Sequence, residues 1–542
     1  MKIIDQFLKS KFLFRFNSKF SIFDLYDYHK LNRNEIYIWY IKRLAFFSIP
    51  INKRKTNGIL LIEKTNEFDT MIKMAAASKS YCTLNNLYPL YYFPLWTRRL
   101  NWIDRKKDIY HYFFKNKSDK FFDTFSNKAI FSGEDDYFDQ TYIDYLYNEI
   151  ILSIKKPTDV LKISIKGIVI GDLIYDTYLR FFSIPTLTDI NDSKLKLLIR
   201  TSINLYCNFE KTLELHNVKA LFTNHSVYIH SGIYTRLSLS KGIKVYSFGL
   251  PIYMVNKVTI DFPFHVFNFH LFNKQLEISK DNLKICHHAM ESRLSGVIDK
   301  GISYMSTSPF SDTKIEDNIL NKFKEFKRNV IIYAHDFYDA PHIVNDLKFT
   351  DYYSWMKNIL ENMKQDDHSK YWIKRHPNSI SNSDEKLIEL VNEYSCYNIS
   401  ILPESITNFH VINHLNPDLV VTASGSIGLE FAYVGIPVVA INDNQYINFN
   451  FLSNCNSLEE YYSIISGQII PKVDFDLQEI LSFYYQAYYL PFQFFKEETC
   501  NLLNFHKKVQ NSTDLLEYLK ESEDLIFSKE IIDSYNHFFL KN

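Results

Sequence analysis

The stretch that decides the fold reads YWIKRHPNS at residues 371–379 and PDLVVTASGSIGLEFAYVGIPVVAI at residues 417–441. Two short apolar runs within it, residues 419–422 and 437–441, are typical of strands that are buried on both faces of a parallel sheet. The residues between the two runs have the 3.6-residue spacing of a helix. The pattern therefore predicts a strand, a tight turn, a helix and a second strand.

The turn of this unit is Ser424-Gly425-Ser426. Gly435 is placed to cap the end of the helix, and Pro437 prevents the helix from continuing. Such a turn leaves backbone N–H groups unpaired at the positive end of a helix. We therefore expect it to bind an anion, above all a phosphate.

The same alternation extends on both sides of this unit. Apolar runs at residues 329–333, 372–374 and 399–402 predict further strands, separated by helical patterns. The first of them ends in the polar loop AHDFYDAPH, which begins at residue 334. Alternating strands and helices predict a doubly wound, mainly parallel sheet.

The first half of the chain predicts a second lobe of the same kind. Strands are expected at residues 58–62, 167–171, 218–222 and 242–246, and a helix from residue 70 is expected to lead into an aromatic loop, YPLYYFPLW. We therefore expect an α/β protein with two Rossmann-like lobes facing a cleft, plus additional helices at both ends. The expected domains are a first α/β lobe with helical additions over residues 1–320, a second Rossmann-like lobe over 325–480, and helices packing back across the lobes over 481–542. The aromatic run at residues 483–495 is expected to belong to the core.

Composition narrows the function. The chain has 542 residues, 62 basic and 62 acidic side chains, and thus no formal net charge. A nucleic-acid partner has no electrostatic support and is not expected. The six cysteines form no C-x-x-C pair, so neither zinc nor a disulfide framework is indicated, and a reducing, cytoplasmic location fits.

Membrane association rests on two segments only. The sequence shows no signal peptide and no apolar stretch long enough to span a bilayer. Residues 3–16 and 35–55 place aromatic side chains beside basic ones. A helix packed on its own domain is the favoured interpretation, and a helix lying at the inner face of the cytoplasmic membrane is the alternative.

Candidate catalytic side chains follow the predicted strands. Asp172 is expected at the carboxyl end of a strand, and Asp176 lies one helical turn later, where it could act or pair with Arg180. His225 follows the strand at residues 218–222, where a base and a capping histidine are equally compatible with the pattern. Asp336 lies in the AHDFYDAPH loop.

Candidate donor-binding side chains gather in the second lobe. Basic groups and hydroxyls there suit phosphate oxygens, and a carboxylate suits ribose hydroxyls. The set is His335, Lys374, Arg375, His376, Ser424, Gly425, Ser426 and Glu430. The chain lacks G-x-G-x-x-G and G-x-x-x-x-G-K-[ST], which disfavours a nicotinamide cofactor and P-loop chemistry. Together these patterns favour a nucleotide-linked sugar as substrate, with no other cofactor.

Several of these motifs resemble those of a known family. KRHP, the AHDFYDAPH loop and SGSIGLEFAYVGIPVV look like the bacterial capsule and surface-polysaccharide glycosyltransferases of the two-lobed GT-B type. This HP-motif group includes β-Kdo transferases, polysialyltransferases and, more distantly, CDP-glycerol glycerophosphotransferases. GDLIYDTYLR and NHSVYIHSGIYTRLSLSKGIKVY resemble the acceptor lobe of the group. The likeness covers residues 166–249 and 329–441.

The resemblance implies a metal-independent transfer of sugar from a nucleotide to a surface or capsular polysaccharide or lipopolysaccharide. His376, Ser424 and Ser426 would contact the donor phosphate and Glu430 the ribose. Cationic side chains would replace a metal at the leaving phosphate. The base for the acceptor is ranked Asp172, Asp336, His225 and Asp176. Ser-Gly-Ser departs from the paired serine of the family, so the donor nucleotide stays open among CMP, UDP, GDP and CDP, with CMP and UDP favoured.

Two alternatives stand beside this interpretation. A UDP-sugar 2-epimerase-like enzyme has the same two-lobed architecture and would convert a nucleotide sugar without an acceptor. A catalytically inactive, glycan-binding subunit of a polysaccharide assembly complex would bind without transferring. Loss of His376 or Glu430 should abolish nucleotide binding in an enzyme and leave partner binding by a scaffold unchanged.

Overall fold

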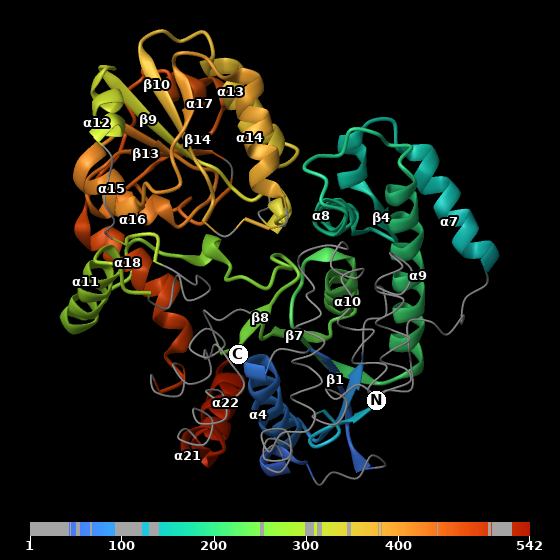
Figure 1. Cartoon of the computed structure of the whole chain (residues 1–542). Helices are drawn as coiled ribbons and strands as arrows, with labels where there is room; N and C mark the ends of the chain where they lie inside the picture. Colours follow the sequence, from blue (N-terminus) through green and yellow to red (C-terminus); the bar gives the residue numbers. More distant parts are fainter. Residues whose placement is uncertain are drawn as a thin grey trace, which may run out of the picture.

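The computed structural model of the protein describes most of both lobes (Figure 1). The described residues are 43, 45–49, 55–65, 68–92, 122–128, 140–249, 254–298, 308–311, 317–343, 348–377, 379–380, 382–441, 443–496, 500 and 523–542. Most of the two segments considered for membrane contact, residues 3–16 and 35–55, therefore lies outside the described residues. Within the described residues, no helix is both long and apolar enough to span a bilayer.

The second lobe is built on a sheet of six parallel strands in the order β11-β10-β9-β12-β13-β14. Its strands are β9 (Arg328–Tyr333), β10 (Ser369–Lys374), β11 (Ile399–Ile401), β12 (Leu419–Val421), β13 (Val438–Ile441) and β14 (Ser453–Cys455). Along β9, Val330 and Ile332 belong to one apolar cluster and Ile331 to another. Both faces of the sheet are therefore covered, which explains why its strands appear in the sequence as continuous apolar runs.

The first lobe repeats this order. Its strands are β1 (Gly58–Glu63), β2 (Leu87–Tyr92), β3 (Asn127–Lys128), β6 (Val218–Thr223), β7 (Lys244–Ser247) and β8 (Asn256–Val258). They form a sheet in the order β3-β2-β1-β6-β7-β8, in which only the edge strand β8 is antiparallel. In both sheets the first strand of the lobe lies beside the fourth, so the chain crosses to the other side of the sheet at that point. The expected α/β class with two Rossmann-like lobes is thus confirmed.

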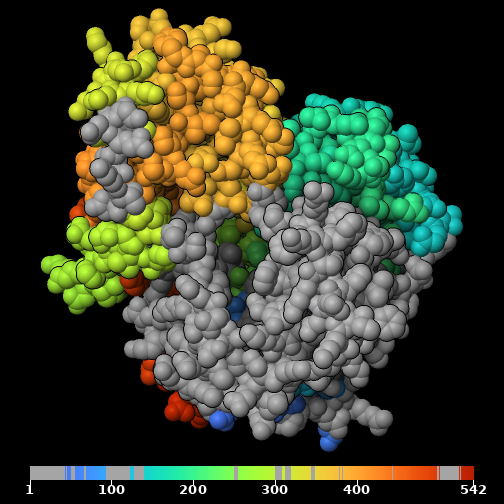
Figure 2. Space-filling view, in the orientation of Figure 1, coloured from blue at the N-terminus to red at the C-terminus, as the bar shows by residue number. Residues whose placement is uncertain are grey.

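Helices cover the sheets and connect the lobes (Figure 1). The first lobe carries α4 (Phe68–Asn85), α7 (Gln140–Ser153), α8 (Gly171–Phe182), α9 (Ser193–Leu215) and α10 (Tyr228–Ser240). The second carries α12 (Asp317–Lys324), α13 (Tyr352–Met363), α14 (Ser383–Tyr394), α15 (Asn408–His410), α16 (Ile427–Tyr433), α17 (Leu458–Ile465) and α18 (Leu477–Tyr488). In Figure 2 the surface of the second lobe, in orange, meets the green surface around α8.

The helices near the end of the chain pack with both lobes. Phe483 of α18 shares an apolar cluster with the second sheet. Helix α22 (Lys529–Lys541) lies against α4, where the Phe539 and Tyr81 ring centroids are 4.8 Å apart. Helix α11 (Lys280–Leu294) falls inside the range expected for the first domain, yet its Cys286 and Met290 lie in the core of the second lobe.

The aromatic loop expected after α4 is wrong, because its first half is strand β2. Leu87–Tyr92 pairs in parallel with β1 and is almost wholly buried. Pro89 made the segment look like a loop, since proline cannot donate a ladder hydrogen bond. The neighbouring β3 pairs only with Leu90 and Tyr91, so Pro89 lies outside that ladder.

The strand expected at residues 167–171 is confirmed only at Ile168–Val169, and it does not belong to the parallel sheet. Lys166 and Gly167 both have positive φ, 49° and 81°, and join two short strands, β4 (Ser164–Ile165) and β5 (Ile168–Val169), into an antiparallel hairpin. Two positive φ values in a two-residue loop give the type I′ turn that hairpins favour. Helix α8 starts at Gly171. Asp172 therefore lies in the first turn of a helix and not at the carboxyl end of a parallel strand.

Candidate functional site

The site begins where β9 and β12 lie side by side at the crossover of the second sheet. His335 follows β9 by two residues, and its Nε2 atom lies 3.2 Å from Thr422 Oγ1. The same nitrogen is 3.3 Å and 3.4 Å from the backbone nitrogens of Ala423 and Ser424, which donate to it. Burial lowers the pKa of His335 to about 3, so the imidazole is neutral and serves as an acceptor. Its ring stacks on Tyr352 with centroids 4.5 Å apart.

The neighbouring strand β10 delivers three basic residues to the same edge. Lys374 Nζ donates to the carbonyl oxygen of Ile406 at 2.5 Å. Burial and, to a smaller extent, the charge of Arg375 lower the pKa of Lys374 to about 8, so the ammonium form still prevails at neutral pH. Arg375 bridges two carboxylates, Asp384 at 3.1 Å and Glu404 at 2.9 Å.

The turn after β12 joins the site as expected, but the helix behind it is short. Helix α16 has seven residues and begins at Ile427, with Ser426 at its N-cap. Gly435 has a φ of 77° and follows the C-cap, which confirms the expected glycine cap. Because the helix is only two turns long, its dipole is a weaker anion attractor than the sequence suggested, and the side chains carry more of the electrostatics.

Glu430 of α16 is buried in an ion pair. Its Oε1 atom lies 3.3 Å from Arg293 Nη1 of α11, and both side chains are at most 2% exposed. Ser426 Oγ lies 3.4 Å from the same carboxylate oxygen. The guanidinium of Arg293 also lies over the rings of Tyr484 and Tyr488. Glu430 is thus an oriented, charge-compensated carboxylate that lines the site.

One cavity of about 1080 Å³ unites these groups. Its wall includes all eight predicted donor-binding residues, namely His335, Lys374, Arg375, His376, Ser424, Gly425, Ser426 and Glu430. Phe269 and Phe272, from the segment that joins the lobes, form an aromatic part of the wall. The structure therefore brings together residues that are up to 95 positions apart, from His335 to Glu430.

The four predicted catalytic residues lie elsewhere. None of Asp172, Asp176, His225 and Asp336 lines this cavity. Asp172 binds the Arg236 guanidinium through both carboxylate oxygens. Asp336 is buried and accepts hydrogen bonds from the backbone N–H groups of Tyr338 and Ile380, which fix the loop after β9.

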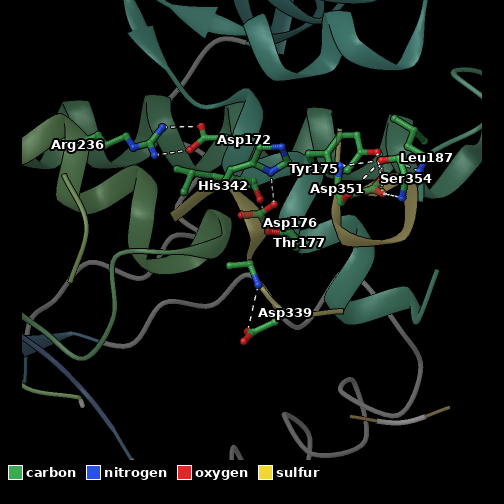
Figure 3. Close-up of polar contacts among 12 residues, drawn as sticks. Asp172, Tyr175, Asp176, Thr177, Leu187, Arg236, Asp339, His342, Asp351 and Ser354 are labelled. Atoms are coloured by element: carbon green, nitrogen blue, oxygen red, sulfur yellow. Dashed lines mark hydrogen bonds and ion pairs between the residues drawn. The ribbon is translucent and has the colours of Figure 1, made fainter. Parts of the chain in front are cut away.

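Asp176 does not pair with Arg180 as the helical spacing suggested. Its Oδ1 atom lies 2.5 Å from His342 Nδ1 of the second lobe (Figure 3). Within the described residues, Arg180 makes no ion pair, and its Nη1 atom is buried without a hydrogen-bond partner. The Nδ1 atom of His225 is also buried without a hydrogen-bond partner. Burial lowers the pKa of His225 to about 4.

Sequence reasoning missed three further residues. Asp339 is an exposed carboxylate on the cavity wall, and its charge acts on His225 of the first lobe. His342 ends the same loop. Both stand in the quoted AHDFYDAPH motif, so the motif itself was the available signal. Arg293 offered none, because its partner Glu430 is 137 positions away.

No clustered metal ligands are found in the described parts of the chain, where His, Cys, Asp and Glu side chains nowhere gather in threes with suitable geometry.

Comparisons with known proteins give distant structural similarities. No protein-family model and no curated protein matches the chain. Among solved structures, KpsC of Thermosulfurimonas dismutans, a beta Kdo 2,4 transferase, is 13% identical over 40% of this chain and 59% of its own, with a TM-score of 0.27. A glycosyltransferase of Rickettsia africae is 10% identical over 87% of this chain and 100% of its own, with a TM-score of 0.27. MnaA of S. aureus, solved with UDP, is 12% identical over 80% of this chain and 93% of its own, with a TM-score of 0.25.

Proposed function

We propose that the protein is a glycosyltransferase that uses a nucleotide-linked sugar. The observation that carries the proposal is the single cavity in which basic, hydroxyl and carboxylate side chains converge at the crossover of the second sheet. Open α/β sheets bind ligands at this position, and the volume suits a nucleotide with an attached sugar. The donors favoured are CMP- and UDP-linked sugars.

The phosphate of the donor would lie between the ends of β10 and β12. Lys374, His376 and the hydroxyls of Ser424 and Ser426 would supply charge and hydrogen bonds there. Arg375, held by Asp384 and Glu404, adds a fixed guanidinium at the rim. Fixed cationic donors stabilise the negative charge that grows on a leaving phosphate, so the transfer would need no metal.

The ribose would face Glu430. Because Arg293 and Ser426 already orient this carboxylate, it can accept hydrogen bonds from ribose hydroxyls without reorganising.

The transfer step needs a base for the acceptor hydroxyl. In the proposed step, the hydroxyl oxygen attacks the anomeric carbon, the bond from that carbon to the phosphate oxygen breaks, and the leaving nucleotide takes the electron pair. The hydroxyl proton passes to a carboxylate. Asp339 is the best-placed group, because it lines the cavity on the side of the first lobe and, within the described residues, forms no ion pair. The acceptor proposed is a growing surface or capsular glycan or glycolipid, met at the inner face of the cytoplasmic membrane.

A nucleotide-release assay tests this function. The protein is incubated with CMP-, UDP- and GDP-linked sugars, with and without EDTA, and the released nucleotide and the sugar are followed by chromatography and NMR. We expect slow, EDTA-insensitive release with one nucleotide class, lost in His376→Ala. Conversion of the sugar without release of nucleotide would instead identify an epimerase, and binding without any conversion would support the scaffold alternative.

His368→Ala is the matched control for His376→Ala. His368 is 89% exposed at the opposite end of β10, so its loss should leave nucleotide release unchanged.

A further inference from the structure

The first lobe is joined to the donor loop by a pair of ionisable side chains. The loop runs from His335 to the short helix Pro341–Ile343. At its far end, His342 Nδ1 lies 2.5 Å from Asp176 Oδ1 of α8, and the two side chains are only 10% and 3% exposed (Figure 3). A buried pair of this kind is strongly oriented, because each partner would otherwise leave a polar atom unpaired away from water.

A second bond lies beside the first. Tyr175 Oη of α8 donates to Asp351 Oδ2 at 2.7 Å, and Asp351 caps α13 through a hydrogen bond from Ser354 N to its Oδ1 atom. The Tyr175 and His342 rings also meet edge to face, with centroids 5.3 Å apart. Two adjacent residues of α8 thus hold two neighbouring elements of the second lobe (Figure 3).

The loop transmits this contact to the donor cavity. His335 at its start contacts the turn after β12, and Asp339 in its middle lines the cavity. Between them, Asp336 accepts hydrogen bonds from Tyr338 N and Ile380 N, which stiffen the loop. A displacement at His342 would therefore move the residues that face the donor.

We propose that Asp176 and His342 form a proton-dependent clasp that holds the first lobe against the donor loop. The two are positioning residues, because they would act on the donor through His335 and Asp339. The effect on the donor rests on the proposed function, whereas the clasp itself does not.

The charges around the clasp favour a bound proton. Asp172, on the same helix, and Asp351, at the start of α13, act on His342 together with Asp176, although Arg236 compensates Asp172. From α10, the Tyr228 hydroxyl also senses Asp176. Burial would lower the pKa of His342, but these carboxylates outweigh it and raise the pKa. Burial raises the pKa of Asp176 to about 6, with the charge of His342 opposing the rise.

Both shifts have the same consequence for the clasp. A group whose pKa is higher in the closed state than in the open state binds its proton more tightly when the lobes are joined. The stabilisation by His342 is present below its ordinary pKa of about 6.5 and is lost as pH rises through the raised value. Asp176 also favours the closed state more at low pH. The clasp should therefore loosen as the pH rises from about 6 through the raised pKa of His342.

Hydrogen exchange of the unliganded protein tests the clasp. Backbone exchange of α8 and of residues 334–343 is measured by mass spectrometry at pH 6 and pH 8, after correction for the intrinsic pH dependence of exchange. We expect protection in both segments to fall about fivefold at pH 8. His342→Gln and Asp176→Asn keep hydrogen-bonding groups and each remove one of the two titrating charges. In both variants protection should be lower than in the wild type, and the difference in protection between the two pH values should shrink.

Two further variants separate the clasp from simple packing. Tyr175→Phe removes the neighbouring bond but no group that titrates between pH 6 and pH 8, so it should lower protection and keep the pH response. His368→Gln removes a histidine from an exposed His368–Asp367 pair and should change neither. A pH response in His342→Gln equal to that of the wild type would overturn the proposal.

Titration with UDP and CMP at both pH values tests the effect on the donor. We expect the wild type to bind its preferred nucleotide more weakly at pH 8, and His342→Gln to lose most of this difference. If neither nucleotide binds the wild type at any pH, the proposed donor site fails, and the exchange experiment still decides on the clasp. If a nucleotide binds with equal pH dependence in both proteins, the clasp does not position the donor loop.

Discussion

The two lobes use the same crossover in opposite ways. In the first lobe, Glu63 ends β1 and accepts hydrogen bonds from Thr223 Oγ1 at the end of β6, from Asn224 N, which follows β6, and from Ser231 Oγ at 2.7 Å. In the second lobe, His335 follows β9 and meets Thr422 and the backbone N–H groups after β12. In both lobes, therefore, a threonine hydroxyl and backbone N–H groups contact the side chain at this position.

The two lobes differ in the side chain that the threonine and the backbone N–H groups contact. Glu63 is a carboxylate that is 4% exposed and bound by close donors. His335 is a neutral ring whose three contacts are 3.2 to 3.4 Å long and which faces the cavity. At the crossover of the first lobe, the side chain at the end of the first strand is enclosed by its partners, whereas in the second lobe the side chain that follows the first strand lines a cavity. The crossover of the first lobe is thus sealed, and that of the second lobe is open.

Removing the carboxylate of the sealed crossover should have the largest effect. Glu63→Ala leaves Asn224 N and Ser231 Oγ without this acceptor inside the protein, whereas Thr223 Oγ1 keeps the carbonyl oxygen of His225. We expect a loss of about 3 kcal/mol in the free energy of unfolding, because hydrogen bonds to a charged group are strong and their buried donors are costly to leave unpaired. Denaturant unfolding measures it. Nucleotide affinity of the folded fraction should not change, and a protein as stable as the wild type would show that this crossover holds nothing together.

Replacing a glycine by alanine should likewise cost more stability beside the crossover of the first lobe than beside that of the second. A Cβ at Gly249 would lie 2.2 Å from the Asn224 carbonyl oxygen, whereas a Cβ at Gly425 would lie 3.0 Å from the Thr422 hydroxyl. A backbone carbonyl group cannot move away from the added methyl group as easily as a side-chain hydroxyl can. Gly249→Ala should therefore cost about 2 kcal/mol of stability and Gly425→Ala less than about 1 kcal/mol. Thermal unfolding of the two variants side by side measures the difference, and equal losses would contradict the sealed-versus-open contrast.

At the open crossover, binding should suffer more than stability. We expect His376→Ala to weaken nucleotide binding about 20-fold, or roughly 1.8 kcal/mol, since it removes one charged or polar contact to a phosphate. Isothermal titration with the nucleotide found in the release assay measures it. The unfolding midpoint should stay close to that of the wild type. An unfolded variant would instead assign His376 to the structure of the lobe.

The smallest expected effect is a pH dependence at Lys374. Because the pKa of this lysine is lowered to about 8, the free protein loses the ammonium charge above that value. In the proposed donor site the ammonium charge contacts the phosphate, so nucleotide affinity should fall by up to about tenfold between pH 7 and pH 9. Affinity measured across this range should flatten in Lys374→Met, which keeps the length of the side chain. A fall of the same size in that variant would assign the dependence to another group.

The sequence could predict the open crossover because its parts are local. Leu419–Val421, the turn after it and Val438–Ile441 lie within 23 residues, and both strands are continuous apolar runs. The basic residues at the end of β10 follow directly from its pattern.

The sealed crossover and the lobe contact could not be predicted, because their pairs are distant in the sequence. Glu63 and Thr223 are 160 positions apart, and Asp176 and His342 are 166 apart. The periodicity of apolar residues along the sequence does not reveal pairs that are so far apart. The expectation of a strand end at Asp172 fails because the sequence pattern does not mark the turn at Lys166 and Gly167 as that of a hairpin.

The packing of α22 on α4 also has a consequence for how the protein is made. The ribosome releases α4 early and α22 only after the entire second lobe has been synthesised. Phe222, Tyr246 and Tyr81 of the first sheet's core close against Phe539, so this core remains unfinished throughout that time. The second lobe, whose strands lie within residues 328–455, can complete its own sheet first. Nascent chains that stop short of α22 should therefore expose the aromatic core of the first lobe to chaperones and proteases, although the missing residues belong to the other end of the sequence.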